Sequence, residues 1–263
     1  MRLNISELLA LEYHDRFDYP MTKEELVKWE YGGKGPNSKK INAEYKDGFY
    51  FLKGGERIIK KRLFRERTSE EKLTIAQKTA GLLSKILFIK MVGITGSLAM
   101  KNADPGSDID LVIITRKDCL WIARLISYFL LRVFGFELRK PEIKKEKNKL
   151  CLNLWLDESD LAWPKDNRNY YTAHEIAQII PIVNKENTYE FFLWQNRWLL
   201  AYWPNSVKIQ NKKFEIQKKE SGFLLRFINL IAFYIQYLYM KNKITKEVVT
   251  LSRAIFHPRQ LSS

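Results

Sequence analysis

Two aspartates, Asp108 and Asp110, stand two residues apart at the start of an apolar run, within the segment GITGSLAMKNADPGSDIDLVII at residues 93–114. Successive side chains of a strand point to opposite faces, so both carboxylates project from one face while Ile109 and Leu111 enter the core. Carboxylates held this close repel each other, and a divalent cation relieves that repulsion. The alternative is a solvated pair of acids at a strand end, met by nearby basic groups.

A Gly-Ser pair precedes the aspartates, between a predicted strand at residues 87–95 and a predicted helix. Gly96 permits a positive φ or a close backbone approach. Ser97 is a favoured N-cap residue, and the free N–H groups of a helix N-terminus bind anions. The pattern predicts a phosphate seated on Gly96 and Ser97, beside a metal ion held by the two carboxylates. We also expect Ser107, in the intervening loop, to contact the ligand that carries this phosphate.

The elements that must position these residues alternate between helix and strand. A long helical passage is predicted over residues 56–86, and further strands are predicted at 108–115 and 149–156, with an apolar helix between them. Strand, helix, strand, helix, strand is the order of an α/β unit. We therefore expect an α+β or α/β fold with a small central sheet.

The segment GSLAMKNADPGSDIDL resembles the signature of the DNA polymerase β-type nucleotidyltransferase superfamily: Gly-Ser at a helix start, about ten residues, then Asp-x-Asp on a strand. The resemblance covers roughly residues 85–160, and the flanking segments resemble an uncharacterised group of prokaryotic nucleotidyltransferase-domain proteins. It implies a mixed-sheet core. It also implies an enzyme that moves a nucleoside monophosphate from an NTP, most naturally ATP, to an RNA, protein or small-molecule acceptor.

The resemblance also implies a role for each residue of the motif. Gly96 and Ser97 would hold the triphosphate, and pyrophosphate would leave. Asp108 and Asp110 would ligate Mg²⁺ and form the catalytic pair.

The superfamily usually has a third carboxylate on a later strand, and the natural position here is Asn153. An amide oxygen is a weak metal ligand, and an amide cannot act as a general base. Asp157 has the same strand parity but lies about 13 Å further along an extended chain. Two hypotheses therefore stay open: a Mg²⁺-dependent nucleotidyltransferase, or a catalytically degenerate module that binds nucleic acid or regulates a partner.

Three regions are expected along the chain. Residues 1–67 resemble a winged helix, with a capping box from Thr22 to Glu25 and a hairpin after it, although a generic helical cap fits equally well. Residues 68–160 form the nucleotidyltransferase core, and residues 161–263 form a helical C-terminal domain.

Within the C-terminal region we expect Pro181 to stop a helix. The most apolar run of the chain, residues 222–240, contains three polar residues, Arg226, Asn229 and Gln236. A membrane-spanning helix needs about 20 mostly apolar residues, so we expect this run to be a buried helix of a soluble domain and expect no membrane partner.

The chain is strongly basic, with a formal net charge of +15 over 263 residues. Such an excess favours polyanionic partners, RNA or DNA among them, although a basic surface also serves solubility. The basic runs at residues 139–149 and 208–219 are either solvated faces or contacts to a nucleic-acid backbone. The sequence does not reveal the oligomeric state.

The cysteines, the N-terminus and the histidines give weaker indications of function. The two cysteines, Cys119 and Cys151, lie in apolar runs without a spacing motif, so we expect no disulfide. The N-terminus lacks the features of a signal peptide, and we expect a cytoplasmic protein. The three histidines lack metal-ligand spacing, and His174 with Glu175 is expected to be a packing or surface pair on a helix.

Overall fold

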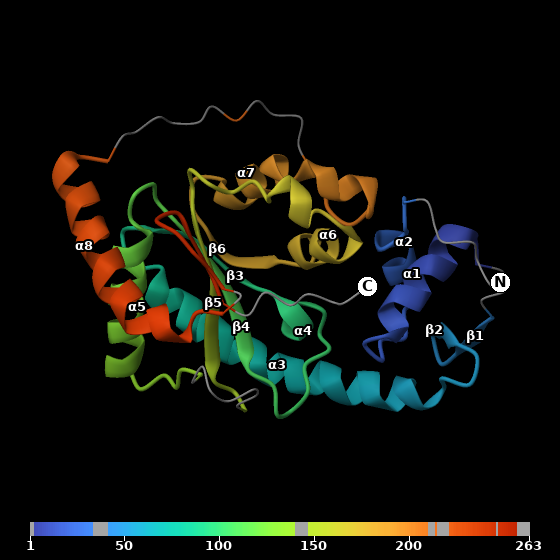
Figure 1. The fold of residues 1–263 in the computed structure, drawn as a ribbon. Helices are drawn as coiled ribbons and strands as arrows, with labels where there is room; N and C mark the ends of the chain where they lie inside the picture. Colours follow the sequence, from blue (N-terminus) through green and yellow to red (C-terminus); the bar gives the residue numbers. More distant parts are fainter. Residues whose placement is uncertain are drawn as a thin grey trace.

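The computed structural model describes residues 3–33, 42–139, 147–209, 214, 221–245 and 247–256. A six-stranded sheet lies at the centre of the fold, with strand order β6-β3-β4-β5-β8-β7 (Figure 1). The strands are β3 (Ile89–Ile94), β4 (Ile109–Thr115), β5 (Leu150–Asp157), β6 (Ile180–Asn184), β7 (Val248–Val249) and β8 (Arg253–Ile255). β4 and β5 pair in parallel and the other neighbours pair antiparallel, so the sheet is mixed as expected.

Helices cover both faces of this sheet. The first face carries α3 (Arg57–Leu83), α5 (Leu120–Val133) and α8 (Phe223–Met240). The second face carries α1 (Ile5–Asp15), α2 (Lys23–Lys28), α6 (Tyr170–Ala177) and α7 (Thr188–Gln195). Short 3-10 helices η1 (Lys165–Asn167), η2 (Arg197–Ala201) and η3 (Lys241–Lys243) lie in the connections.

Side-chain alternation along β4 decides which face receives the acidic residues. Leu111 and Ile113 pack into the core on the first face, and Val112 packs into the core on the second. Asp110 shares the parity of Val112, so its side chain belongs to the second face, the face covered by α6. The two aspartates thus come from a strand that is otherwise buried on both sides.

The N-terminal region contains the predicted helices and hairpin, the latter formed by β1 (Ala43–Lys46) and β2 (Phe49–Leu52). The predicted capping box is present: Thr22 Oγ1 accepts from the Glu25 N–H at 3.2 Å, and Glu25 Oε2 accepts from the Thr22 N–H at 3.0 Å. Glu25 also accepts from the buried Arg62 of α3 at 2.8 Å. α3 itself continues without a break across residue 67, where the sequence places the end of this region. The winged-helix interpretation stays a prediction.

The C-terminal region is not purely helical. β6, β7 and β8 all belong to the central sheet, in addition to the expected helices. Pro181 lies inside β6 and does not stop a helix as expected. A proline is tolerated there because β6 is an edge strand, where a missing N–H need not break a hydrogen bond between strands. This region therefore completes the sheet of the core.

The expectation of a buried helix at residues 222–240 is wrong. α8 is long and apolar enough to cross a membrane, with a mean hydropathy of 1.4, yet only 17% of that span is buried. It packs on α5 at the edge of the molecule, on the opposite side of the sheet from α6 (Figure 1). The buried positions of α8 are Asn229, Ala232 and Gln236, so both of its side-chain amides face inward, whereas Arg226 is exposed.

Candidate active site

The carboxylates of Asp108 and Asp110 meet at the start of β4, as the strand geometry predicts. Asp108 is 6% exposed and Asp110 is 7% exposed. One oxygen of each carboxylate and the sulfur of Cys151 lie within 4.8 Å of one another. Burying charges costs roughly several kcal/mol for each ion unless positive charge compensates. A pair of buried acids therefore calls for cations at this position.

Arg139 supplies one positive charge to the cluster. Its Nη1 lies 3.0 Å from Asp108 Oδ2 and donates to Cys151 Sγ at 3.3 Å. Burial, with the charge of Asp110 added, raises the pKa of the Cys151 thiol to about 12, so the sulfur stays protonated at neutral pH. A hard cation such as Mg²⁺ prefers oxygen, so the carboxylates rather than the thiol are its ligands here.

A β-bulge in β5 brings Asn153 to the same acids. Asp110 pairs with Cys151, but Val112 pairs with Leu154, so β5 carries one extra residue between these pairs. Asn153 Nδ2 donates to Asp110 Oδ1 at 3.0 Å. Asn153 Oδ1 is buried and has no hydrogen-bond partner among the described residues. An unsatisfied buried oxygen costs about 1–3 kcal/mol, and a cation shared with the carboxylates would satisfy it.

Asp157 does not join this cluster. The bulge reverses the side-chain alternation of β5, so the parity that Asp157 shares with Asn153 in the sequence does not place it on the same face. Asp157 instead accepts from the backbone N–H groups of Asp118 at 2.7 Å and Ser159 at 2.9 Å. Burial raises the pKa of Asp157 to about 6. The strand therefore brings an amide, not a carboxylate, to Asp110.

Gly96, the first residue of the short helix α4 (Gly96–Ala99), adopts a left-handed backbone conformation that favours glycine. Gly96 has a φ of +66°, and a Cβ there would lie 2.9 Å from Asp110 Oδ2. The turn and the aspartate are therefore packed directly against each other. The N-cap residue of α4 is Thr95, so Ser97 lies inside the first turn and is not the N-cap that the sequence predicts. The left-handed glycine begins the helix two residues earlier than expected.

The loop between α4 and β4 is held by one face of α3. Arg65 Nε donates to Asp104 Oδ1 at 2.9 Å, and Arg65 Nη2 donates to Asp104 Oδ2 at 3.2 Å. One turn further, Ser69 Oγ accepts from the Ala103 N–H at 3.1 Å. Arg65 belongs to a basic run of α3, but it is buried in this ion pair rather than presented to solvent.

Lys72 supports the end of the same loop, next to the aspartates. Its buried Nζ donates to the Ser107 carbonyl and to Asn148 Oδ1, both at 2.7 Å. The Ser107 hydroxyl donates to the Asp104 carbonyl at 2.8 Å, so it closes the loop on itself. The predicted contact between Ser107 and a nucleotide stays a prediction. Residues 65, 69 and 72 follow helical spacing, so the whole loop rests on one stripe of α3.

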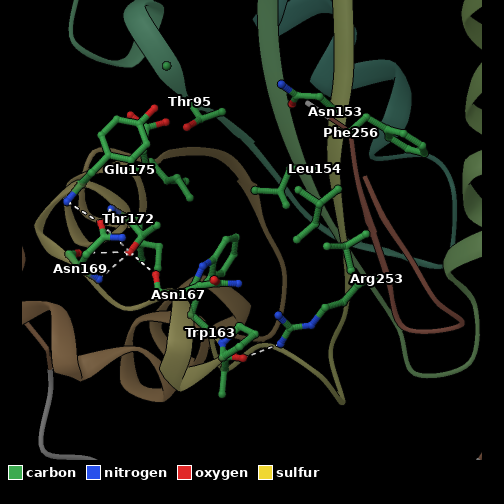
Figure 2. A pocket seen from close by; sticks show the side chains of 18 of the residues that line it. Thr95, Asn153, Leu154, Trp163, Asn167, Asn169, Thr172, Glu175, Arg253 and Phe256 are labelled. Carbon is green, nitrogen blue, oxygen red and sulfur yellow. Dashed lines mark hydrogen bonds between the residues drawn. The ribbon is translucent and has the colours of Figure 1, made fainter. Parts of the chain in front are cut away.

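A pocket of about 900 Å³ opens beside this site (Figure 2). Gly96, Asp110 and Asn153 form part of its wall, so the acidic site faces into it. Ligand pockets commonly have volumes of about 300–1,000 Å³, which includes room for a nucleotide. The other walls come from the segment 160–172, from α6 and from β7 and β8, and include the aromatic residues Trp163, Tyr170, Tyr171 and Phe256.

One wall of the pocket is fixed by Arg253 of β8. This buried guanidinium donates to Asp160 Oδ2 at 2.7 Å and to Asp160 Oδ1 at 2.6 Å. It also lies 5.9 Å from the centre of the Trp163 ring. Trp163 lines the pocket next to this ion pair (Figure 2).

Sequence reasoning missed the part of the pocket that α6 supplies. Glu175 was expected to pair with His174 in packing or at the surface, but Glu175 and Thr172 line the pocket (Figure 2). His174 instead packs in the core, with its Nε2 at 3.1 Å from His14 Nε2. No local sequence signal separates these neighbours, because the position of α6 depends on β6 pairing with β3.

Most of the basic runs at 139–149 and 208–219 lies outside the described residues. The two cysteines are free and buried.

Residues 77–174 match the family model described as a nucleotidyltransferase domain. The match runs from the last turns of α3 into α6 and contains the Gly96 turn, both aspartates and Asn153. This part of the chain is thus similar to a nucleotidyltransferase domain, which is consistent with a member of the polymerase β-type superfamily that the motif resembles. No curated protein and no solved structure matches the chain. The match supports nucleotidyl transfer as the general function, and this family typically uses a divalent metal ion as cofactor.

Proposed function

We propose that the protein transfers a nucleoside monophosphate from an NTP, with ATP as the natural donor, to a hydroxyl group on an RNA, a protein or a small molecule. One observation carries the proposal: the carboxylates of Asp108 and Asp110 converge, and Asp110 packs against the Gly96 turn and lines a pocket of about 900 Å³. An ATP-dependent transferase of this kind would act in the cytoplasm.

In the proposed reaction, the acceptor oxygen forms a bond to the α-phosphorus. The bond from that phosphorus to the oxygen bridging to the β-phosphate breaks, and pyrophosphate leaves with its electron pair. Asp108, Asp110 and Asn153 Oδ1 would hold Mg²⁺, which stabilises negative charge on phosphate oxygens when it is bound. Gly96 lets the backbone come close to the phosphates, because it carries no side chain.

The proton of the acceptor hydroxyl needs a base, and Asn153 cannot be one. Among the described acids that line the pocket, Asp160 is paired with Arg253, and Asp166 lies exposed on η1. Asp110 is assigned to the metal. By elimination we assign Glu175 as the base that accepts the proton of the acceptor hydroxyl. Its Oε1 accepts a hydrogen bond from Gln178 Nε2 at 2.7 Å.

The test is incubation with Mg²⁺, each α-labelled NTP, and total RNA or protein extract as acceptor. We expect label transfer by the wild type and none by Asp108→Ala. Glu175→Gln should lower kcat by about 10²–10⁴-fold, because a general base contributes that much. Asp166→Ala removes an exposed acid from the same pocket and serves as the matched control, with near-normal transfer. Near-normal activity of Asp108→Ala would overturn the proposal.

The second candidate is a degenerate module that binds RNA or DNA or regulates a partner. Asn153 at the position of the third acid and the net charge of +15 favour it. Salt-sensitive binding of nucleic acid without label transfer, and no gain of transfer in Asn153→Asp, would support this candidate over the enzyme.

A further inference from the structure

Two polar side chains of α8, Asn229 and Gln236, face the protein. Asn229 Oδ1 accepts from the backbone N–H groups of Trp121 at 2.9 Å and Ile122 at 3.2 Å, at the start of α5. Gln236 Nε2 donates to the Trp121 carbonyl at 2.8 Å, and Gln236 Oε1 accepts from Arg124 Nη1 at 2.6 Å. These bonds fix the rotation of α8, and they turn its apolar side outward.

The outward side of α8 is wide and apolar. Phe223 is 85% exposed and Leu224 is 69% exposed. With about 100° between successive residues, the exposed aliphatic and phenylalanine side chains and the flanking tyrosines cover roughly 200° of the helix circumference. The tyrosines at the margins of this arc are Tyr237 and Tyr239. The neighbouring helix α5 also has an exposed apolar residue, Phe129.

The width and composition of this face favour a lipid surface over a protein partner. A helix that packs on a protein core buries an apolar stripe of roughly 100°, so one partner helix would leave much of the arc in water. Protein interfaces also carry about one hydrogen bond per 100–200 Å², whereas the described residues of this arc offer only tyrosine hydroxyls. Tyrosine is enriched at the boundary between membrane and water.

Basic side chains lie near the apolar face. Arg226 lies beside the arc with its side chain 62% exposed and its Nε 3.6 Å from Asp118 Oδ2, and the exposed Lys241 follows the last residue of α8. Arg132 on α5 is exposed as well. The whole chain has a net charge of +15, which attracts an anionic surface. This combination of an apolar face with a basic rim is typical of helices that lie in the membrane interface.

We propose that α8 and the adjoining surface of α5 lie on an anionic lipid bilayer, with the apolar arc in the boundary between headgroups and acyl chains. The helix lies on the bilayer and does not span it. Its inward side is bonded to α5, and the residues at both ends return to the domain: Ser221 Oγ donates to the Lys117 carbonyl at 2.7 Å, and β7 pairs with β8.

This placement leaves the active site accessible. α8 packs on the first face of the sheet, whereas α6 and its wall of the pocket lie on the second face (Figure 1). The inference therefore does not depend on the proposed transfer reaction, and a failure of one does not bear on the other.

The test is flotation of the full-length protein with vesicles of phosphatidylcholine alone and with vesicles that also contain phosphatidylglycerol. We expect flotation with the anionic vesicles and much less with the neutral ones. The variant Phe223→Ser/Leu224→Ser/Leu238→Ser should lower the partition coefficient at least about tenfold, because it removes three apolar side chains from the lipid boundary.

The matched control is Ile5→Ser/Val27→Ser, which changes two exposed apolar residues of α1 and α2, on the second face of the sheet, and should float like the wild type. Thermal unfolding establishes that all variants are folded. Absence of flotation, or equal flotation of the triple variant, would overturn the proposal. Sedimentation equilibrium without lipid provides the other decisive outcome: a wild-type dimer that the triple variant abolishes would assign the face to a second copy of the chain instead.

Discussion

Replacing Asn153 with Asp would set a third carboxylate against Asp110. The substitution removes the hydrogen bond that Asn153 Nδ2 donates to Asp110 Oδ1 at 3.0 Å. A hydrogen bond to a charged group contributes about 1.5–3 kcal/mol. At pH 7 the two carboxylates avoid repulsion by keeping a proton, which costs up to about 4 kcal/mol for a group of ordinary pKa. We therefore expect the free energy of unfolding to fall by about 2–4 kcal/mol.

The pH dependence of this loss has a definite sign. A retained proton means that the pKa of a carboxyl is higher in the folded than in the unfolded state, so the deficit is largest near neutral pH and shrinks as the pH falls. Urea unfolding at pH 7 and pH 5, in EDTA and in Mg²⁺, measures it. Mg²⁺ should restore stability to the variant more than to the wild type, because three carboxylates bind it more tightly than two. A variant as stable as the wild type at both pH values in EDTA would refute the contact between position 153 and Asp110.

Two further predictions concern the supports of the site and the core. Lys72→Met should lower the free energy of unfolding by about 2–4 kcal/mol, because it leaves the buried Ser107 carbonyl and the half-buried Asn148 amide oxygen without their charged donor. Lys78→Met, an exposed change on the same helix, should stay within about 0.5 kcal/mol of the wild type in urea unfolding. Burial lowers the pKa of His14 to about 4 and that of His174 well below its ordinary 6.5, so both are neutral in the fold. Stability should fall as the pH drops from about 6.5 towards 4, and His174→Phe should show a shallower dependence; an unchanged slope of the urea midpoint against pH would contradict this account.

Local signals in the sequence were sufficient for the elements that carry the motif. The capping box at Thr22 is present, and the apolar run after Asp108 forms a strand, because both depend on neighbours within a few residues. The pair Asp108 and Asp110 faces one way for the same reason, since alternation is a property of the strand itself.

Features that depend on pairing between distant segments could not be predicted. A β-bulge puts the side chains of Asn153 and Asp157 on opposite faces of the sheet. This bulge is defined only by how β5 pairs with β4. Glu175 reaches the pocket only because β6 pairs with β3. The sequence also could not predict which side of α8 faces the protein. Hydropathy shows Asn229 and Gln236 only as polar residues within an apolar run, and it does not show that they hydrogen-bond to α5.

Nucleotide-dependent Mn²⁺ binding, followed by electron paramagnetic resonance with a non-hydrolysable ATP analogue, tests the central claim most directly. Mn²⁺ accepts the oxygen ligands that Mg²⁺ uses and has a paramagnetic signal. The wild type and Asp166→Ala should bind the ion together with the analogue, whereas Asp108→Ala and Asp110→Ala should not. Equal Mn²⁺ binding by the Asp110→Ala variant, or none by the wild type, would contradict the assignment of this buried acidic pair as a metal and nucleotide site.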